Sequence, residues 1–304
     1  MEYIKELSSQ QILQALENSQ EEWGKSRPLE DLHQKVMSLV NFDGPPVLLM
    51  KGFMSDNGQI VSSLKRYQFS LSTPEGIIPC AGLGAIFTRI EERSKGIASQ
   101  LIKKVLDEAR AEGFGASLLF SDIGAEYYQK FGFEALPDLS WRADVKKLLG
   151  AEFLRVRSAT PSDTEQLIQW YESSFPQGFL RIIRNDKTWN FFRLRTPPSE
   201  ELVFFDDEQD VAYASLSFGD NLLWVEEIGV AKTGLENRIW ATIANLAQQK
   251  GLQLVGSWLR PDAVPDGFVG ISREKALPMV LSFANASIVP EFESQIHFES
   301  LDHF

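Results

Sequence analysis

Few side chains in this chain of 304 residues are suited to disulfides or to soft metal sites. The single cysteine, Cys80, excludes an intramolecular disulfide and is typical of a protein from a reducing compartment. The three histidines, His33, His297 and His303, are scattered along the chain, which argues against a histidine-based metal site. We therefore expect a cytoplasmic protein that holds no metal ion.

Long apolar segments and an excess of basic residues are also missing. No apolar run reaches the roughly 18 residues of a membrane-spanning helix, and the first six residues contain no apolar signal core. The net charge of −12 argues against general nucleic-acid binding, which requires a basic surface. The composition thus predicts a globular protein that binds neither membranes nor nucleic acids.

One short segment, 89–104, is basic within this acidic chain, with five basic and two acidic side chains. Inside it, Arg93-Ser94-Lys95-Gly96-Ile97-Ala98 lies between a strand-like run ending at Thr88 and a helical pattern of apolar residues. A loop that opens a helix presents unpaired backbone N–H groups and the positive end of the helix dipole, and both bind phosphate. The alternative is an ordinary strand-to-helix turn with solvated basic side chains.

The order of predicted elements divides the chain into two halves with a similar plan. The first half is predicted to have helices in its first forty residues, and then strands and helices at 46–51, 59–71, 80–88, 97–109, 116–121 and from 125. The second half is predicted to have strands at 154–157, 202–205, 211–218, 222–230 and 252–259, with helices from 160 and at 235–250. Residues 137–151 are expected to connect two domains, 1–150 and 151–304.

Three features of the first half fit one enzyme family. Arg93 to Ala98, followed by Ser99, is similar to an Arg/Gln-x-x-Gly-x-Gly/Ala loop, and Phe87-Thr88 ends the preceding strand. Residues 126–133, Glu-Tyr-Tyr-Gln-Lys-Phe-Gly-Phe, are similar to a Phe-Tyr-x-x-x-Gly-Phe segment about 30 residues after the loop. Over residues 45–136 the chain therefore resembles the GCN5-related N-acetyltransferase (GNAT) superfamily.

This resemblance implies a fold and a co-substrate. The fold is α/β (α+β), with two tandem GNAT-like domains, each a mixed, mostly antiparallel twisted sheet flanked by helices. The co-substrate is acetyl-CoA. Its pyrophosphate would bind Arg93, Ser94, Lys95, Gly96, Ile97, Ala98 and Ser99, and the backbone of Phe87 and Thr88 would hold the pantetheine and acyl group.

The resemblance also implies catalytic roles. In this family an amine attacks the thioester directly, so no nucleophilic side chain is needed. Tyr128 is the predicted general acid for the departing thiolate, and the alternative is that it only packs against Phe131 and Phe133. Asp122 is the predicted base, acting directly or through water, or a group that binds a cationic acceptor. Alternatively, Asp122 caps the helix that begins near Ala125.

The second half resembles a degenerate copy of the first. Residues 231–237 follow the strand 222–230 but lack the Arg-x-x-Gly-x-Gly pattern, so we expect no cofactor there. We expect this half to contribute to the acceptor pocket. The candidate residues are Trp224, Glu226, Glu227 and Trp258, although both tryptophans could instead belong to the core.

The sequence thus predicts a monomer or homodimer that transfers an acetyl group to a primary amine of a small molecule. Segments 60–63, 85–88 and 119–124 resemble the yeast-type lysine N6-acetyltransferase subgroup, which would imply an amino acid such as lysine as acceptor. The alternatives are a non-catalytic acyl-CoA-binding scaffold or sensor, and an N-acetyltransferase that acts on proteins or peptides.

Overall fold

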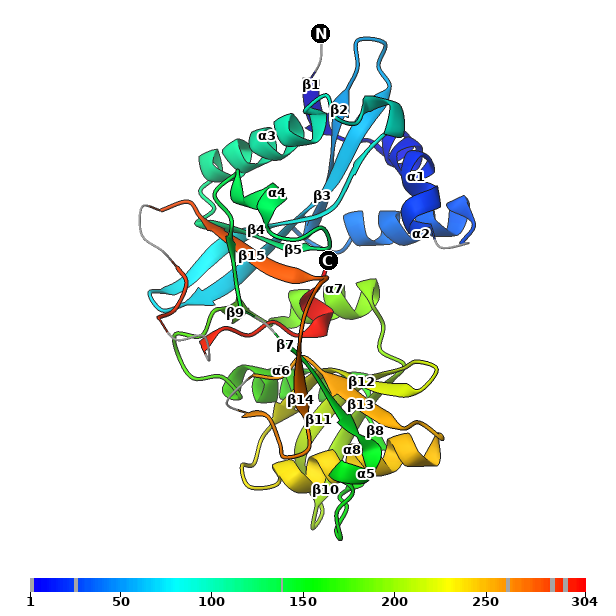
Figure 1. Cartoon of the computed structure of the whole chain (residues 1–304), viewed down its shortest axis with the longest axis vertical. Helices are drawn as coiled ribbons and strands as arrows, with labels where there is room; N and C mark the ends of the chain where they lie inside the picture. The colour runs from blue at the N-terminus through cyan, green and yellow to red at the C-terminus, as the bar shows by residue number, and fades with distance from the viewer. Residues whose placement is uncertain (1–2, 25–26, 138, 261–262, 285–287, 292–294) are drawn as a thin grey trace.

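Two twisted sheets follow one another along the long axis of the molecule (Figure 1). The structure is a computed structural model that describes residues 3–24, 27–137, 139–260, 263–284, 288–291 and 295–304. Within these residues the first sheet has eight strands and the second has seven. Each sheet is covered by helices, so the predicted fold class, α/β with two mixed, mostly antiparallel sheets flanked by helices, is confirmed.

The first sheet is formed mainly by the first half of the chain. Its strands run in the order β1-β2-β3-β4-β5-β15-β6, and β9 pairs with β3. These strands are β1 (Tyr3–Glu6), β2 (Leu48–Met54), β3 (Ile60–Thr73), β4 (Gly76–Thr88), β5 (Ala116–Ser121), β6 (Glu134–Ala135), β9 (Arg181–Ile182) and β15 (Leu277–Ser282). The helical segments of this half are α1 (Ser9–Trp23), α2 (Leu29–Val40), η1 (Ile90–Glu92), α3 (Ile97–Ala111) and α4 (Glu126–Gln129).

Helices cover both faces of the first sheet, because neighbouring strand residues point to opposite sides. On one face, Leu64 and Leu83 pack in one cluster with Leu101 of α3. The apolar residues of α3 recur at helical spacing and are buried, as the sequence predicts. On the other face, Met50 of β2 packs in a second cluster with Leu16 of α1 and with α2.

The second sheet runs in the order β14-β7-β13-β12-β11-β10-β8. One of its faces is buried under α8 and α5 and the other under α6 and α7. The strands are β7 (Leu139–Asp144), β8 (Arg155–Ser158), β10 (Glu200–Asp206), β11 (Gln209–Phe218), β12 (Leu222–Val230), β13 (Leu254–Ser257) and β14 (Val269–Ser272). The helical segments are α5 (Val145–Leu148), η2 (Pro161–Asp163), α6 (Thr164–Ser173), α7 (Asp186–Arg195), α8 (Glu236–Gln249) and η5 (Ser300–Asp302).

The two sheets exchange strands across the middle of the sequence. Strand β7 lies near the end of the first half of the chain but pairs with β13 of the second sheet. Strand β15 lies near the end of the second half of the chain but pairs with β5 of the first sheet (Figure 1, orange). The expected connection at 137–151 is therefore wrong in part, because it contains β7 and α5. The domain limits 1–150 and 151–304 stay a prediction.

Candidate active site

The basic loop lies in the structure at the N-terminus of α3. Gly96 is the residue before the helix and adopts a left-handed backbone with φ of +79°. No side chain caps the helix, so the first backbone N–H groups of α3 remain available to a ligand. The loop borders a pocket of about 280 Å³. Its lining includes seven of the predicted cofactor residues, which are Thr88, Arg93, Ser94, Gly96, Ile97, Ala98 and Ser99.

The two cations of the loop pair with carboxylates. The Arg93 guanidinium contacts Glu22 of α1 and donates from Nε to the Thr88 carbonyl at 3.0 Å. Lys95 pairs with Glu92 at 3.0 Å but does not line the pocket. Arg93 therefore lies where a phosphate group could bind, while Lys95 contributes charge from the rim.

Lys130 is a third cation at this pocket, which the sequence reasoning missed. Its ammonium donates to Ser99 Oγ at 3.1 Å and lies 3.7 Å from the centre of the Tyr127 ring. Lys130 and Ser99 also border a neighbouring hollow along α3 with a volume of about 530 Å³. Lys130 directly follows α4 and belongs to the segment 126–133 that carried the family resemblance, and this position could have indicated its role.

The end of β4 separates from β5 beside the loop. The parallel pairing of the two strands ends at Leu83 and Leu119. The register with β3 shifts next to this point, and Ala85 adopts a positive φ of +47°. This bulge redirects the backbone between Gly84 and Thr88, as bulges near active sites commonly do.

The two strand residues predicted to hold the pantetheine differ in their surroundings. The Phe87 ring is buried in a cluster with Phe53, Val61 and Ile97, and its carbonyl accepts a hydrogen bond from Ser62 Oγ at 2.7 Å. Thr88 lines the loop pocket. The Phe87 side chain is therefore structural, and any contact with the cofactor from this residue must come from its backbone.

The point where β4 and β5 stop pairing is called the strand opening below. A cavity of about 500 Å³ lies on the α1 and α2 side of this opening. It contains the two predicted catalytic side chains, Tyr128 and Asp122. Other side chains come from α1, α2, β2, β3, β4, β5 and the end of the chain, and they include Leu16, Glu22, Trp23, Leu32, Met50, Ser63, Lys65, Ile86, Phe120, Ile123, His303 and Phe304.

Tyr128 both packs in the core and borders this cavity. Its ring lies edge-on to Tyr127 and Phe133, with centroid distances of 5.1 and 6.3 Å. Burial, with smaller effects from Tyr127 and Asp122, raises the pKa of Tyr128 to about 12. The phenol therefore stays protonated at neutral pH and can donate a hydrogen bond into the cavity.

Asp122 lies at the end of β5 and does not cap α4, whose N-cap residue Ala125 has no side-chain cap. Instead, Asp122 Oδ1 accepts a hydrogen bond from the backbone N–H of Ala276, just before β15, at 3.0 Å. The Asp122 side chain is otherwise exposed to the cavity. It is therefore available to a substrate while one oxygen fixes the start of β15.

The segment 295–304 returns to the first sheet and completes the cavity, a placement that the sequence did not indicate. The Phe304 ring packs 4.5 Å from the Tyr67 ring. A β-carbon on Gly84 would lie only 2.7 Å from the Phe304 carbonyl oxygen, so only glycine permits this approach. Desolvation lowers the pKa of His303, although Asp122 acts in the opposite direction.

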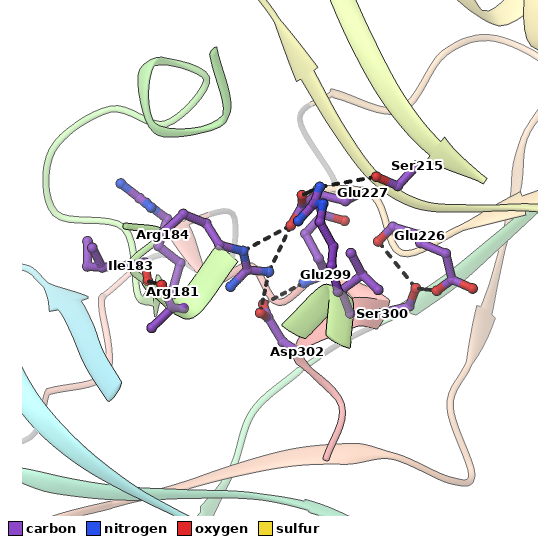
Figure 2. A network of polar contacts seen from close by, with 12 residues as sticks. Arg181, Ile183, Arg184, Ser215, Glu226, Glu227, Glu299, Ser300 and Asp302 are labelled. Atoms are coloured by element: carbon purple, nitrogen blue, oxygen red, sulfur yellow. Dashed lines mark hydrogen bonds and ion pairs between the residues drawn. The ribbon is translucent and has the colours of Figure 1, made fainter. Parts of the chain in front are cut away.

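A buried ionic network holds this segment against the second sheet (Figure 2). Arg184 pairs with Glu227 of β12 at 2.8 Å and with Asp302 of η5 at 2.6 Å, and all three side chains are fully buried. Glu227 also accepts from Arg193 at 2.9 Å and from the Tyr213 hydroxyl at 2.9 Å. Burial opposes ionisation of Glu227, but the two arginines hold its pKa below the usual value.

The four acceptor-pocket candidates from the second half do not line the cavity. Glu227 belongs to the ionic network, and Glu226 and Trp224 both contact Ser300, the tryptophan Nε1 at 3.0 Å. Trp258 stacks on Phe120, with ring centroids 6.5 Å apart. These residues lie behind the cavity wall and do not border this cavity, and their contribution to an acceptor pocket stays a prediction.

The described residues contain neither a metal-binding cluster nor a membrane-spanning helix. In the described ranges, no three or more His, Cys, Asp or Glu side chains are grouped so that they could hold a metal ion. No helix in the same ranges combines the length and apolar character needed to cross a membrane.

Comparison with known proteins agrees with this geometry. Residues 3–136 match the family model described as "Acetyltransferase (GNAT) domain". A comparison with curated proteins found no match. The fold is similar to a probable N-acyltransferase from Enterococcus faecalis, with 13% identity, a TM-score of 0.73, and coverage of 93% of this chain and 72% of that one.

Two further solved structures share the fold over most of their length. One is a GCN5-related N-acetyltransferase from Anabaena variabilis, with 14% identity, a TM-score of 0.72, and coverage of 92% of this chain and 72% of that one. The other is the Saccharomyces cerevisiae N-myristoyltransferase with bound myristoyl-CoA, with 12% identity, a TM-score of 0.57, and coverage of 92% and 82%.

The fold and the family model over residues 3–136 together support an N-acetyltransferase. Residues 3–136 match the GNAT domain model, and the loop and the tyrosine segment that carried the resemblance both lie within this range.

Proposed function

We propose that this protein transfers an acetyl group from acetyl-CoA to a primary amine of a small molecule, in the first sheet only. The supporting observation is that neighbouring residues of β4 and α4 line the loop pocket and the large cavity. Thr88 and Tyr127 line the pocket, and their near neighbours Ile86 and Tyr128 line the cavity. A thioester that extends from the loop through the strand opening would therefore reach Tyr128.

In this proposal the segment Arg93 to Ser99 binds the acetyl-CoA pyrophosphate. The helix dipole and free backbone N–H groups favour an anion, and Arg93, Lys95 and Lys130 supply positive charge. The backbone of Phe87 and Thr88 holds the pantetheine, and a backbone N–H at the bulge polarises the thioester carbonyl.

The chemical step is direct attack of the amine on the thioester carbonyl carbon. The carbon–nitrogen bond forms, the carbon–sulfur bond breaks, and the electron pair of that bond leaves on sulfur. Tyr128 donates a hydrogen bond or its proton to the thiolate. Asp122 receives the proton that the attacking amine loses, directly or through water. The products are an N-acetylated amine and CoA, and positioning supplies much of the rate.

The acceptor in this proposal is a small amine, with an amino acid such as lysine as the first candidate. The cavity volume of about 500 Å³ is within the range of small-molecule sites. The exposed Asp122 carboxylate favours an amine that arrives as an ammonium ion. We further propose that the protein acts in the cytoplasm as a monomer or homodimer.

A thiol-release assay with acetyl-CoA and a panel of amines tests this function. We expect at least one small amine to release CoA well above the hydrolysis rate in buffer, with the acetylated amine identified by mass spectrometry. Release with peptides but not with small amines would indicate protein acetylation instead. CoA binding without any release above buffer would contradict the proposed transfer.

A further inference from the structure

Lys65 is a cation inside the large cavity that the proposed mechanism does not use. It lies on β3, half-buried, and its side chain borders the cavity, whereas its neighbour Leu64 packs toward α3. In the described part of the chain, no carboxylate or other polar group lies within hydrogen-bonding or ion-pair distance of its ammonium group.

Other cations of this sheet differ from Lys65 in this respect. Arg66, the next residue of β3, donates to Glu112 at 2.9 Å, and Lys51 of β2 pairs with Glu108 at 3.1 Å. The two carboxylates that line the cavity with Lys65 have other partners, since Glu22 contacts Arg93 and Asp122 accepts from Ala276. The protein has thus paired the cations beside Lys65 but has left this one facing the cavity.

A half-buried ammonium group without a protein partner is costly unless something else solvates or pairs with it. A charge-assisted hydrogen bond to an anion is among the stronger polar contacts available to it. The cavity also has an apolar wall of Leu16, Leu32 and Met50, so a small ligand with a short apolar stem would fit between its polar groups.

We propose that Lys65 binds a carboxylate of the acceptor. The acceptor is therefore an amino acid or a related small molecule that carries both an amine and a carboxylate. This inference rests on the proposed function, because Tyr128 and Asp122 at the same cavity would receive the amine. Lys65 then determines specificity and takes no part in the chemical step.

The experiment compares amino acids with their carboxamides, which have nearly the same size but no carboxylate. Wild type, Lys65→Met and Lys65→Arg are assayed with acetyl-CoA and a panel of such pairs that includes lysine and lysinamide. Lys51→Met is the matched control, because it removes a lysine of the adjacent strand that lies outside the cavity. Thermal unfolding of each variant verifies that it is folded.

We expect wild type to favour at least one amino acid over its amide. Lys65→Met should raise the KM for that acid about tenfold to a hundredfold, the range for losing a hydrogen bond to a charged group. Its kcat should change little, and its KM for the amide should stay constant. Lys65→Arg should recover part of the preference, and Lys51→Met should match wild type.

Calorimetric titration of the same compounds into protein saturated with CoA separates this inference from the proposed function. CoA cannot transfer an acetyl group, so binding of the acid is measured without turnover. Weaker binding of the acid to Lys65→Met alone supports the inference even if no acetylation is found. Equal use and equal binding of acids and amides by wild type, or an unchanged preference in Lys65→Met, would overturn it.

Discussion

The first and second sheets contain the same strand opening, and the chain uses the two openings differently. In the first sheet, β4 and β5 stop pairing at Leu83 and Leu119, and the opening leads to the loop pocket and the cavity. In the second, β12 and β13 stop pairing at Val225 and Ser257. The residues of β12 beyond that point, from Glu226, contact the turn η5 of the same chain.

The opening of the first sheet is thus available to a ligand, whereas the opening of the second sheet is filled by a segment of the same chain. Ser300 Oγ contacts the Glu226 carbonyl at 3.2 Å, and the arginine network closes around Glu227 (Figure 2). The loop after β12, residues 231–235, contains one basic residue, Lys232, and Gly234 has a φ of +86°. We infer that the second repeat now supports the segment that carries His303 and Phe304 into the first repeat's cavity.

The largest effect, on stability, should follow from disrupting the ionic network that fills the opening of the second sheet. Glu227→Ala would leave Arg184 and Arg193 buried without their shared carboxylate. Removing one partner from a buried ion pair typically costs about 3–5 kcal/mol of unfolding free energy. Urea denaturation followed by far-ultraviolet circular dichroism measures this cost.

Asp210→Ala is the control for that variant, because Asp210 forms a surface pair with Arg157, which also keeps Asp163. It should cost no more than about 1 kcal/mol. If Glu227→Ala were as mild as Asp210→Ala, the network would be dispensable for stability, and the filled opening would need another explanation.

The next effect comes from the two loop glycines, which offer a matched pair. Gly96 and Gly234 both have positive φ, and a β-carbon at either position would meet nothing within 4 Å. Gly96→Asp and Gly234→Asp should therefore carry a similar backbone cost in the free protein. Only Gly96→Asp places a carboxylate where the pyrophosphate would bind, so it should weaken CoA binding at least about a hundredfold, given two or more lost charge-assisted contacts.

Calorimetric titration with CoA checks this pair. Gly234→Asp should bind CoA as wild type does. Equal affinity of both variants would remove the pyrophosphate role from the loop, and equal loss in both would mean that the second repeat also binds CoA.

Local chemistry explains which parts could be predicted from the sequence. The loop, Tyr128 and the apolar pattern of α3 depend on residues that are close in sequence, and the structure shows them at one opening. The strand exchange by β7 and β15, and the return of His303 to Asp122, depend on pairings between distant segments. Such pairings produce no recognisable periodicity or residue spacing in the sequence of either segment.

The same limit explains why the sequence presented Glu227 as a candidate pocket residue, whereas the structure places it in the ionic network. A glutamate in a strand of alternating polarity resembles a pocket residue when only its neighbours are known. Its burial becomes evident only when α7 supplies Arg193 and the preceding loop supplies Arg184. Lys65 was overlooked for the converse reason, since only the structure shows that it has no partner among the residues described.

Tyr128→Phe should have a smaller effect than the loop variant, and on turnover instead of binding. General acid catalysis typically contributes about a hundredfold or more, so we expect kcat to fall by about that factor while CoA affinity stays nearly constant. Thiol-release assays measure kcat, and calorimetric titration measures the affinity for CoA. An equal loss in both quantities would show that the tyrosine only packs.

The pH dependence sharpens the role of Tyr128. Because burial raises its pKa to about 12, the phenol keeps its proton well above neutral pH. Its ionisation should therefore cause no fall in kcat between pH 7 and pH 10, and the ratio of wild-type to Tyr128→Phe kcat should be constant over that range. A ratio that declines as pH rises toward 10 would mean that the phenol ionises earlier than its burial implies.

The smallest effect should come from Lys130, which reports how far the charge of the first repeat extends beyond its loop. Lys130 is exposed and donates to Ser99 at 3.1 Å, so its interaction with a phosphate group would be weakened by solvent and salt. Lys130→Met should raise the KM for acetyl-CoA about threefold to fivefold, with the difference shrinking in 0.5 M salt, because exposed charge pairs are worth only about 1 kcal/mol. Lys147→Met removes a lysine from α5, beside the second sheet, and should leave that KM unchanged. If both variants had equal effects, the attraction would belong to the net charge of the protein, and the cofactor site would be limited to the loop and the start of α3.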